Sequence, residues 1–294
     1  MVTVGSILSG TFGFVRDNVR AVLVWSGILF VASLISLPLM QPIYAQQLAA
    51  VQPGVPAAPH IGMFGLLVPI FLLVFVILWA AAYRAVLFPE QQRFFYLRVG
   101  MDELRLLGTM LILVVGGIVL TLLFGLVLGL AVGLIAMALG AAGSALISFL
   151  TFVLFVGGWI FLGVRLSLAG PLTILQRKVI IGPSWRATRG NFWRLFGAYL
   201  VIILLLTIVY GVVAFVQMGS ILPDMMRPTD PAAHARVLAW QAAHYSLSAS
   251  GLIAAVVGSI IGSVAVALQA GGTAVATAQL LDRRGEQHLS EVFE

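Results

Sequence analysis

The stretch 106–164, between Arg105 and Arg165, contains no charged residue. A continuous helix over this range would be about 90 Å long at 1.5 Å per residue. The hydrocarbon core of a bilayer is only about 30 Å thick, and about 20 apolar residues span it. The stretch therefore has to reverse direction. The run 140–144 (Gly-Ala-Ala-Gly-Ser) is the expected turn, because glycine tolerates the backbone angles of a tight reversal.

The composition of the whole chain places this hairpin in a membrane protein. Hydrophobic residues make up 61% and charged residues 9% of the chain, and the mean hydropathy is +1.11. An ordinary soluble domain is about one quarter charged, so this chain could not cover a water-exposed surface. A cytosolic enzyme, a nucleic-acid-binding module and a disordered chain are thereby excluded. We predict an all-α, polytopic transmembrane bundle.

Six segments are long and apolar enough to be spans, within a single integral membrane domain over 1–294. They lie near 20–40, 63–83, 106–133, 144–164, 195–217 and 249–272. The first apolar run is longer than the core of a signal peptide, so we interpret it as a retained span. We expect Pro38 to end the first span, Pro69 to kink the second and Pro171 to stop the fourth.

The basic residues predict the orientation. The chain has 16 Lys and Arg against 10 Asp and Glu, a net charge of +6. All but two of the basic residues fall in the N-terminal arm, the connections between spans two and three and spans four and five, and the tail. The exceptions are Arg227 and Arg236. Because short cytoplasmic loops carry the excess of Lys and Arg, both termini are predicted to be cytoplasmic.

A threefold pattern marks the entries to spans on this side. Aligning Arg105 with Arg194 places Asp102 on Asn191, and Asn18 holds a similar position before the first span. Each entry is followed by two spans, which predicts three tandem units of an interfacial segment plus a helical hairpin. Asn and Asp are preferred N-cap residues, so we interpret Asn18, Asp102 and Asn191 as helix caps rather than ligands.

The connection between spans four and five combines arginine with aromatic residues. Such a segment is expected to lie in the headgroup plane and attract anionic lipids. Simple anchoring of the chain is the alternative to a specific phosphate site. The candidate headgroup-binding residues on the predicted cytoplasmic side are Arg84, Arg98, Arg105, Arg165, Arg186, Arg189, Arg194, Trp185 and Trp193.

Small residues recur every four positions in two of the spans. The third span carries Gly117, Thr121, Gly125, Gly129 and Gly133, and the sixth carries Gly251, Ala255, Ser259, Ser263, Ala267 and Gly271. Such faces allow close packing of helices within the bundle or between protomers. A narrow pathway lined by backbone and small side chains is the alternative.

Catalytic and metal-binding patterns are missing from the sequence. No ionisable residue lies at the middle of a predicted span, which argues against a proton-coupled pump. Cysteine is absent, so thiolate metal sites are excluded. His60, His234 and His244 all lie on the predicted outer side, but their spacing matches no ligand motif. We expect no metal, no cofactor and no enzymatic activity.

Short motifs carry a resemblance to a known group of proteins. They are the run from Arg165 through Leu200, which includes Pro171 and Arg189-Gly190-Asn191, and the segments Tyr83–Leu87 and Tyr96–Arg98. The chain resembles the membrane domain attached to some bacterial glycerophosphoryl diester phosphodiesterases, and stand-alone proteobacterial membrane proteins grouped with them. Their catalytic barrel has no counterpart here. The resemblance implies a six-span inner-membrane protein with lipid-related work, and no hydrolysis.

These observations favour two functional hypotheses from different classes, and a third, an intramembrane lipid enzyme using Asp102 or Glu103, is the least favoured. The first is a non-enzymatic protein of the bacterial inner membrane that engages anionic lipids, and potentially other membrane subunits, through its cytoplasmic Arg and Trp residues. Nucleic acid is not an expected partner. The second is a passive channel or transporter for lipid or a small solute, suggested by the small-residue faces and the threefold repeat.

Overall fold

The computed structural model describes residues 2–50, 61–227 and 229–293. Side chains at 41–50, 61–64, 66, 136, 138–142, 144 and 283–293 lie outside that description. The chain is 86% helical, and the described part contains no strand. The fold class is therefore all-α, as the composition indicates.

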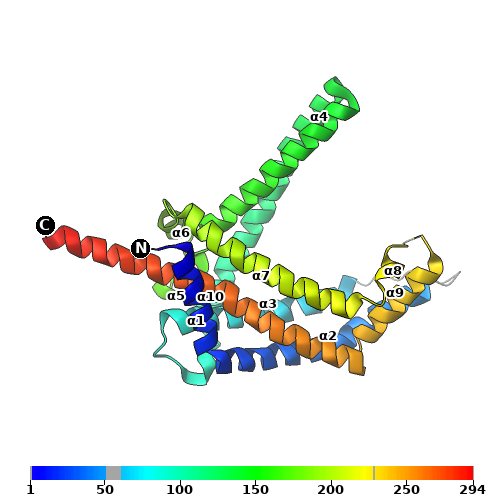
Figure 1. The fold of residues 1–294 in the computed structure, drawn as a ribbon, viewed down its shortest axis with the longest axis horizontal. Helices are drawn as coiled ribbons and strands as arrows, with labels where there is room; N and C mark the ends of the chain where they lie inside the picture. The colour runs from blue at the N-terminus through cyan, green and yellow to red at the C-terminus, as the bar shows by residue number, and fades with distance from the viewer. Residues whose placement is uncertain (1, 51–60, 228, 294) are drawn as a thin grey trace. The chain divides into compact units, whose positions relative to one another are not determined.

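Helices of very different length alternate along the chain (Figure 1). They are α1 (Val4–Asp17), α2 (Val19–Ala50), α3 (Ile61–Leu87), the short turn η1 (Arg93–Tyr96), α4 (Met101–Leu166), α5 (Ala169–Gln176), α6 (Gly182–Ala187), α7 (Phe192–Met218), α8 (Leu222–Met225), α9 (Pro231–His244) and α10 (Ala249–Phe293).

Among the described residues, six helical segments are long and apolar enough to cross a membrane, as predicted. They are Val19–Met40, Leu67–Leu87, Arg93–Ile135, Ala145–Gln176, Phe192–Met218 and Ala249–Asp282. Each of them overlaps one predicted span. The chain thus has the helices of a multi-pass membrane protein.

The chain divides into two compact units that are described separately. The first contains Met1–Ile7, Val99–Ala198 and Thr273–Glu294, and the second contains Leu8–Arg98 and Tyr199–Gly272. The first unit holds α4, α5, α6 and the start of α7. The second holds α2, α3, η1, α8, α9 and most of α7 and α10.

Helix α4 reverses direction within the first unit. Helical backbone is assigned continuously over Met101–Leu166, but its two halves lie side by side (Figure 1). A Cβ atom built on Gly117 would lie 2.9 Å from the Trp159 ring, although the two residues are far apart along the helix. The predicted hairpin is therefore present. The side chains of most of the expected turn, 140–144, lie outside the described set.

Two proline predictions were wrong. Helix α2 continues past Pro38 to Ala50, because apolar spans tolerate a proline whose freed carbonyl finds other partners. Helix α4 ends at Leu166, before Pro171, which instead lies in the first turn of α5. Proline costs little there, because first-turn N–H groups have no intrahelical acceptor. Pro69 lies inside α3, as expected.

The small-residue faces of the third and sixth spans differ in their packing. In α4, Gly117 meets Trp159, but a Cβ on Gly125, Gly129 or Gly133 would have no described neighbour within 4 Å. Close packing at Gly129 is therefore not seen within the described residues, and the alternative of contact between protomers stays a prediction.

The second unit buries the small-residue face of α10. A Cβ on Gly262 would lie 3.3 Å from Leu29, and one on Gly271 would lie 2.6 Å from the Phe14 ring. The hydroxyls of Ser26 and Ser263 are buried and 2.5 Å apart. The expected packing role is confirmed for this helix. Small residues let α10 approach α1 and α2 closely, and a buried hydrogen bond links α10 to α2.

The connection between α7 and α10 is tied by an ion pair. The Arg236 guanidinium on α9 donates to both carboxylate oxygens of Asp224 on α8, at 2.6 and 2.9 Å. This hydrogen bond holds the pKa of Asp224 below its usual value. On the same helix, burial lowers the pKa of His244, whose ring stacks on Trp240 at a centroid distance of 4.5 Å.

We expect acidification to loosen this connection in two steps. Because the pKa of His244 is lowered in the folded protein, its contribution to folding stability is present above about pH 6.5 and is lost as the pH falls below that value. Asp224 also has a lowered pKa, so its contribution is present above about pH 4 and is lost below it. Hydrogen exchange of α8 and α9 against pH would detect both steps. Asp224→Asn should abolish only the lower step, and His244→Gln only the upper; unchanged protection between pH 8 and 3 would contradict the prediction.

Candidate functional site

Two of the three expected caps, Asn18 and Asn191, directly precede a helix as predicted, whereas Asp102 does not. Asn18 lies between α1 and α2, and its side-chain amide donates to the Phe14 carbonyl at 3.0 Å, so it bonds the end of the preceding helix. Asp102 lies inside the first turn of α4. Glu103 instead accepts from the N–H of Gly100, the N-cap residue, at 2.9 Å. Which residue caps a helix depends on where the helix begins. A sequence pattern does not resolve a shift of that start by one or two positions.

The entries to α4 and α7 share a side-chain contact. Asp102 accepts from the guanidinium of Arg105 at 2.9 Å, and Asn191 accepts from that of Arg194 at 3.2 Å. Asn191 directly precedes α7, and its carbonyl accepts from the Leu195 N–H at 3.0 Å, as at an N-cap. Its side chain therefore orients an arginine rather than capping the helix. The aligned sequence positions perform the same local task.

The side chain of Arg84 is buried inside the second unit. It is 2% exposed, and one guanidinium nitrogen donates to the Tyr96 carbonyl in the η1 turn. In that turn the φ angles of Phe94, Phe95 and Tyr96 are 53°, 56° and 66°. Left-handed backbone is unfavourable for such residues. Arg84 therefore stabilises a strained turn and is not placed where a headgroup in the bilayer surface would meet it.

The other candidate arginines have different exposures. Arg98, Arg186, Arg189 and Arg194 are exposed, whereas Arg105 and Arg165 are partly buried. Trp185 is 41% exposed and Trp193 is 76% exposed. Five of the predicted residues lie together along α6 and the start of α7, and we call them the Arg/Trp surface: Trp185, Arg186, Arg189, Trp193 and Arg194.

Helix α6 is fastened to the end of α4. The hydroxyl of Ser184 donates to the Arg165 carbonyl at 2.8 Å, and the hydroxyl of Thr188 reaches the same oxygen at 3.4 Å. Both residues are fully buried. Because Ser184 and Thr188 are one helical turn apart, they project from the same side of α6. These two hydrogen bonds, from Ser184 and Thr188 to the Arg165 carbonyl, form the clasp between α6 and α4, and they position the Arg/Trp surface.

An aromatic bracket surrounds the Arg165 side chain. The central guanidinium carbon lies 5.2 Å from the ring centre of Phe161, 5.3 Å from that of Trp185 and 6.0 Å from that of Phe192. These distances are typical of cation–π contacts. Phe161 and Phe192 were not among the predicted site residues. Their signal in the sequence was the four-residue spacing of Phe161 and Arg165, which places them on one helix face.

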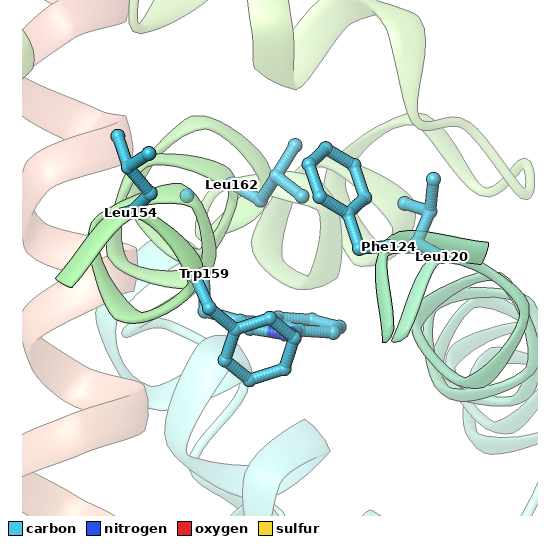
Figure 2. Close-up of a pocket in the computed structure, with 7 residues that line it drawn as sticks. Leu120, Phe124, Leu154, Trp159 and Leu162 are labelled. Carbon is cyan, nitrogen blue, oxygen red and sulfur yellow. The ribbon is translucent and has the colours of Figure 1, made fainter. Parts of the chain in front are cut away.

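Two hollows in the described part of the chain were considered as ligand sites. The first, about 30 Å³, lies between the halves of α4 and is lined by apolar groups, with Leu120 and Phe124 facing Leu154, Trp159 and Leu162 (Figure 2). It has room for about one water molecule. It is therefore a packing gap rather than a ligand site.

The second hollow is an open groove of about 530 Å³ in the second unit, lined by α7 and α10. We call it the α7/α10 groove. Its polar side chains are Thr207, Tyr210 and Gln269, all of which are exposed. They lie inside the two candidate spans, at positions where lipid tails would surround an isolated chain. No charged side chain lines this groove.

No metal centre is visible among the side chains that the structure describes, since no three histidine or acidic residues gather there. His60 lies outside the described residues, so the three outer-side histidines are not all placed. The comparisons with known proteins add no relative to this picture. No protein-family model, no curated protein and no solved structure matches this chain.

Proposed function

We propose that this protein is a non-enzymatic, multi-pass protein of the bacterial inner membrane that binds anionic lipid headgroups through the Arg/Trp surface. The observation that carries the proposal is the grouping of three exposed arginines with two exposed tryptophans, from α6 to the first turn of the apolar helix α7. The resemblance to membrane domains of glycerophosphoryl diester phosphodiesterases favours the same lipid-related role.

Tryptophan and arginine both interact favourably with the membrane at the depth of the headgroups. Tryptophan settles at the boundary between headgroups and acyl chains because its ring is both apolar and a hydrogen-bond donor. Each arginine near an anionic leaflet contributes about 1 kcal/mol of attraction. The clasp between α6 and α4 holds these groups at the end of a candidate span rather than on a free loop.

The orientation belongs to the same proposal. Both termini and the Arg/Trp surface face the cytoplasm, because nearly all basic residues are in connections on one side of the six spans. A C-terminal alkaline phosphatase fusion should be inactive, and a C-terminal green fluorescent fusion should fluoresce. The reverse pair of results would overturn the orientation.

The tandem organisation also stays a proposal. The matching contacts Asp102–Arg105 and Asn191–Arg194 support a relation between the second and third units of the predicted repeat. The first unit of the predicted repeat has Ala21 at the position of Arg105 and Arg194, so it lacks this contact.

Binding to vesicles tests the lipid role. We expect reconstituted or detergent-purified protein to retain phosphatidylglycerol in native mass spectrometry. Changing Arg186, Arg189 and Arg194 together to Gln should weaken this binding by about a hundredfold, from about 1 kcal/mol per charge. The corresponding Lys variant should bind nearly as well as the wild type if charge alone matters.

A matched control uses an arginine from the opposite side. Arg227 is exposed between α8 and α9 and lies in a predicted outer connection, so Arg227→Gln should leave binding unchanged. Absence of any retained anionic lipid in the wild-type protein would contradict the proposed function.

The α7/α10 groove favours a second candidate, a passive route for a lipid or small solute. Uncharged polar groups at the middle of two spans are costly in lipid unless something pairs with them. If the groove is part of a route, Gln269→Leu should reduce flux through liposomes while leaving the protein folded. Background flux in wild-type liposomes would exclude this candidate.

A further inference from the structure

The guanidinium of Arg165 has buried nitrogen atoms without a hydrogen-bond partner. Nε and Nη1 are shielded from solvent, and neither donates to any group in the described part of the chain. No carboxylate pairs with this arginine there. A buried N–H that makes no hydrogen bond costs free energy, and more so when it carries charge. The position of Arg165 therefore calls for an acceptor.

The surroundings of Arg165 hold the side chain ready for such an acceptor. The rings of Phe161, Trp185 and Phe192 surround the guanidinium within about 6 Å of its central carbon. Phe192 also packs against Phe161, with ring centres 5.4 Å apart. The backbone of Arg165 is fixed by the Ser184 and Thr188 hydroxyls. Fixing both ends of the residue lowers the entropy that binding would otherwise cost.

The acceptor that suits these features is a phosphate group. A planar guanidinium directs several N–H donors at an oxyanion and favours phosphate and carboxylate over neutral acceptors. The neighbouring α6 and α7 segments supply further positive charge through Arg186, Arg189 and Arg194. An incoming cation would be repelled by all four residues.

We propose that Arg165 is the anchor of a discrete phosphate site, which in the membrane is filled by the phosphate of one phospholipid. This inference rests on the proposed function and sharpens it, from attraction by a charged surface to a one-to-one site. The aromatic bracket holds the guanidinium, and the Arg/Trp surface forms the rim. Arg165 is the last residue but one of α4, and the proposed site places its guanidinium at the depth of the headgroups.

A lipid titration with the full-length protein tests the site. Dioleoyl phosphatidylglycerol is added to purified protein, and native mass spectrometry counts the lipids retained. We expect one tightly held lipid per chain. Arg165→Lys should weaken that binding by about ten- to a hundredfold, the loss expected for hydrogen bonds to a charged group. Arg177→Lys is the matched control, an exposed arginine in the same unit with no aromatic bracket, and should bind as the wild type does.

A second variant keeps the test decisive if Arg165→Lys does not fold. Phe192→Leu removes one ring of the bracket and leaves every charge in place. We expect it to weaken binding about two- to fivefold, the effect of one lost cation–π contact. An affinity equal to the wild type in both variants would overturn the discrete site.

A phosphate competition and a comparison of two variants distinguish a lipid site from a soluble-phosphate site, and the Arg165 anchor from the charged surface. Millimolar inorganic phosphate should not displace the lipid; displacement would support the phosphate site but assign it to a soluble phosphate. If Arg165→Lys binds like the wild type while the triple Gln variant of the Arg/Trp surface loses binding, the anchor is wrong and the proposed function stands. If the wild-type protein retains no phosphatidylglycerol, the proposed function itself fails.

Discussion

Gly251→Ala should strongly destabilise the folded protein. The added Cβ would lie 2.0 Å from the Ser246 carbonyl oxygen and 2.8 Å from that of His244. These are backbone atoms, so the entry to α10 has to move as a unit. We expect a loss of about 3 kcal/mol or more, at the upper end of overpacking effects. Thermal unfolding of the detergent-purified variant would measure the loss.

Gly258→Ala is the matched control for this prediction. It lies in the same helix, and its Cβ would have no described neighbour within 4 Å. Replacing glycine by alanine inside a helix stabilises it by up to about 1 kcal/mol. Equal melting temperatures for the two variants would show that the turn before α10 is not built as described.

Trp25→Ala should produce a loss of similar size by another mechanism. Trp25 is fully buried in the second unit, and its indole N–H donates to the Phe95 carbonyl at 3.2 Å. Removal leaves a large cavity, which costs about 3–5 kcal/mol. It also removes one of the contacts that hold the left-handed η1 turn. We expect a lower unfolding midpoint and faster proteolysis at 93–96.

Trp193→Ala provides the comparison at an exposed position. This side chain is 76% exposed, so its loss should change stability by about 0.5 kcal/mol or less. The proposed lipid role predicts that Trp193→Ala nevertheless weakens binding to vesicles. A Trp25→Ala variant as stable as Trp193→Ala would contradict the packing of the second unit.

The spans were predictable because their physical cause is local. An apolar run of sufficient length between charged residues is visible without knowledge of any partner, and the predicted 195–217 and 249–272 both lie within observed candidate spans. The hairpin in α4 followed from the same argument, since a helix over 106–164 is too long for a bilayer. Local composition also gathered the residues of the Arg/Trp surface in one connection before the fifth span, which the structure builds from α6, the residues after it and the first turn of α7.

The ends of helices and the partners of single side chains were harder to predict. Pro38 lies inside α2, and the cap of α4 falls to Gly100 and Glu103 rather than Asp102. Each depends on small energy differences between neighbouring positions, about 1 kcal/mol for a cap. A sequence pattern does not resolve such differences. Tandem similarity aligned Asp102 with Asn191 and Arg105 with Arg194, but only the structure showed that each pair is in contact.

The amino-acid order was sufficient to establish an all-helical chain with six lipid-compatible spans and arginines gathered in a few connections, because each of these properties depends on residues adjacent along the chain. The surroundings of two arginine side chains, Arg84 and Arg165, differ in a way that their neighbours along the chain do not predict. Arg84 is buried and donates to the η1 turn, whereas Arg165 is partly buried and lies among three aromatic rings. Their difference arises from contacts with successive elements, η1 for Arg84 and α6 and α7 for Arg165, and only folding brings these elements against the two arginines.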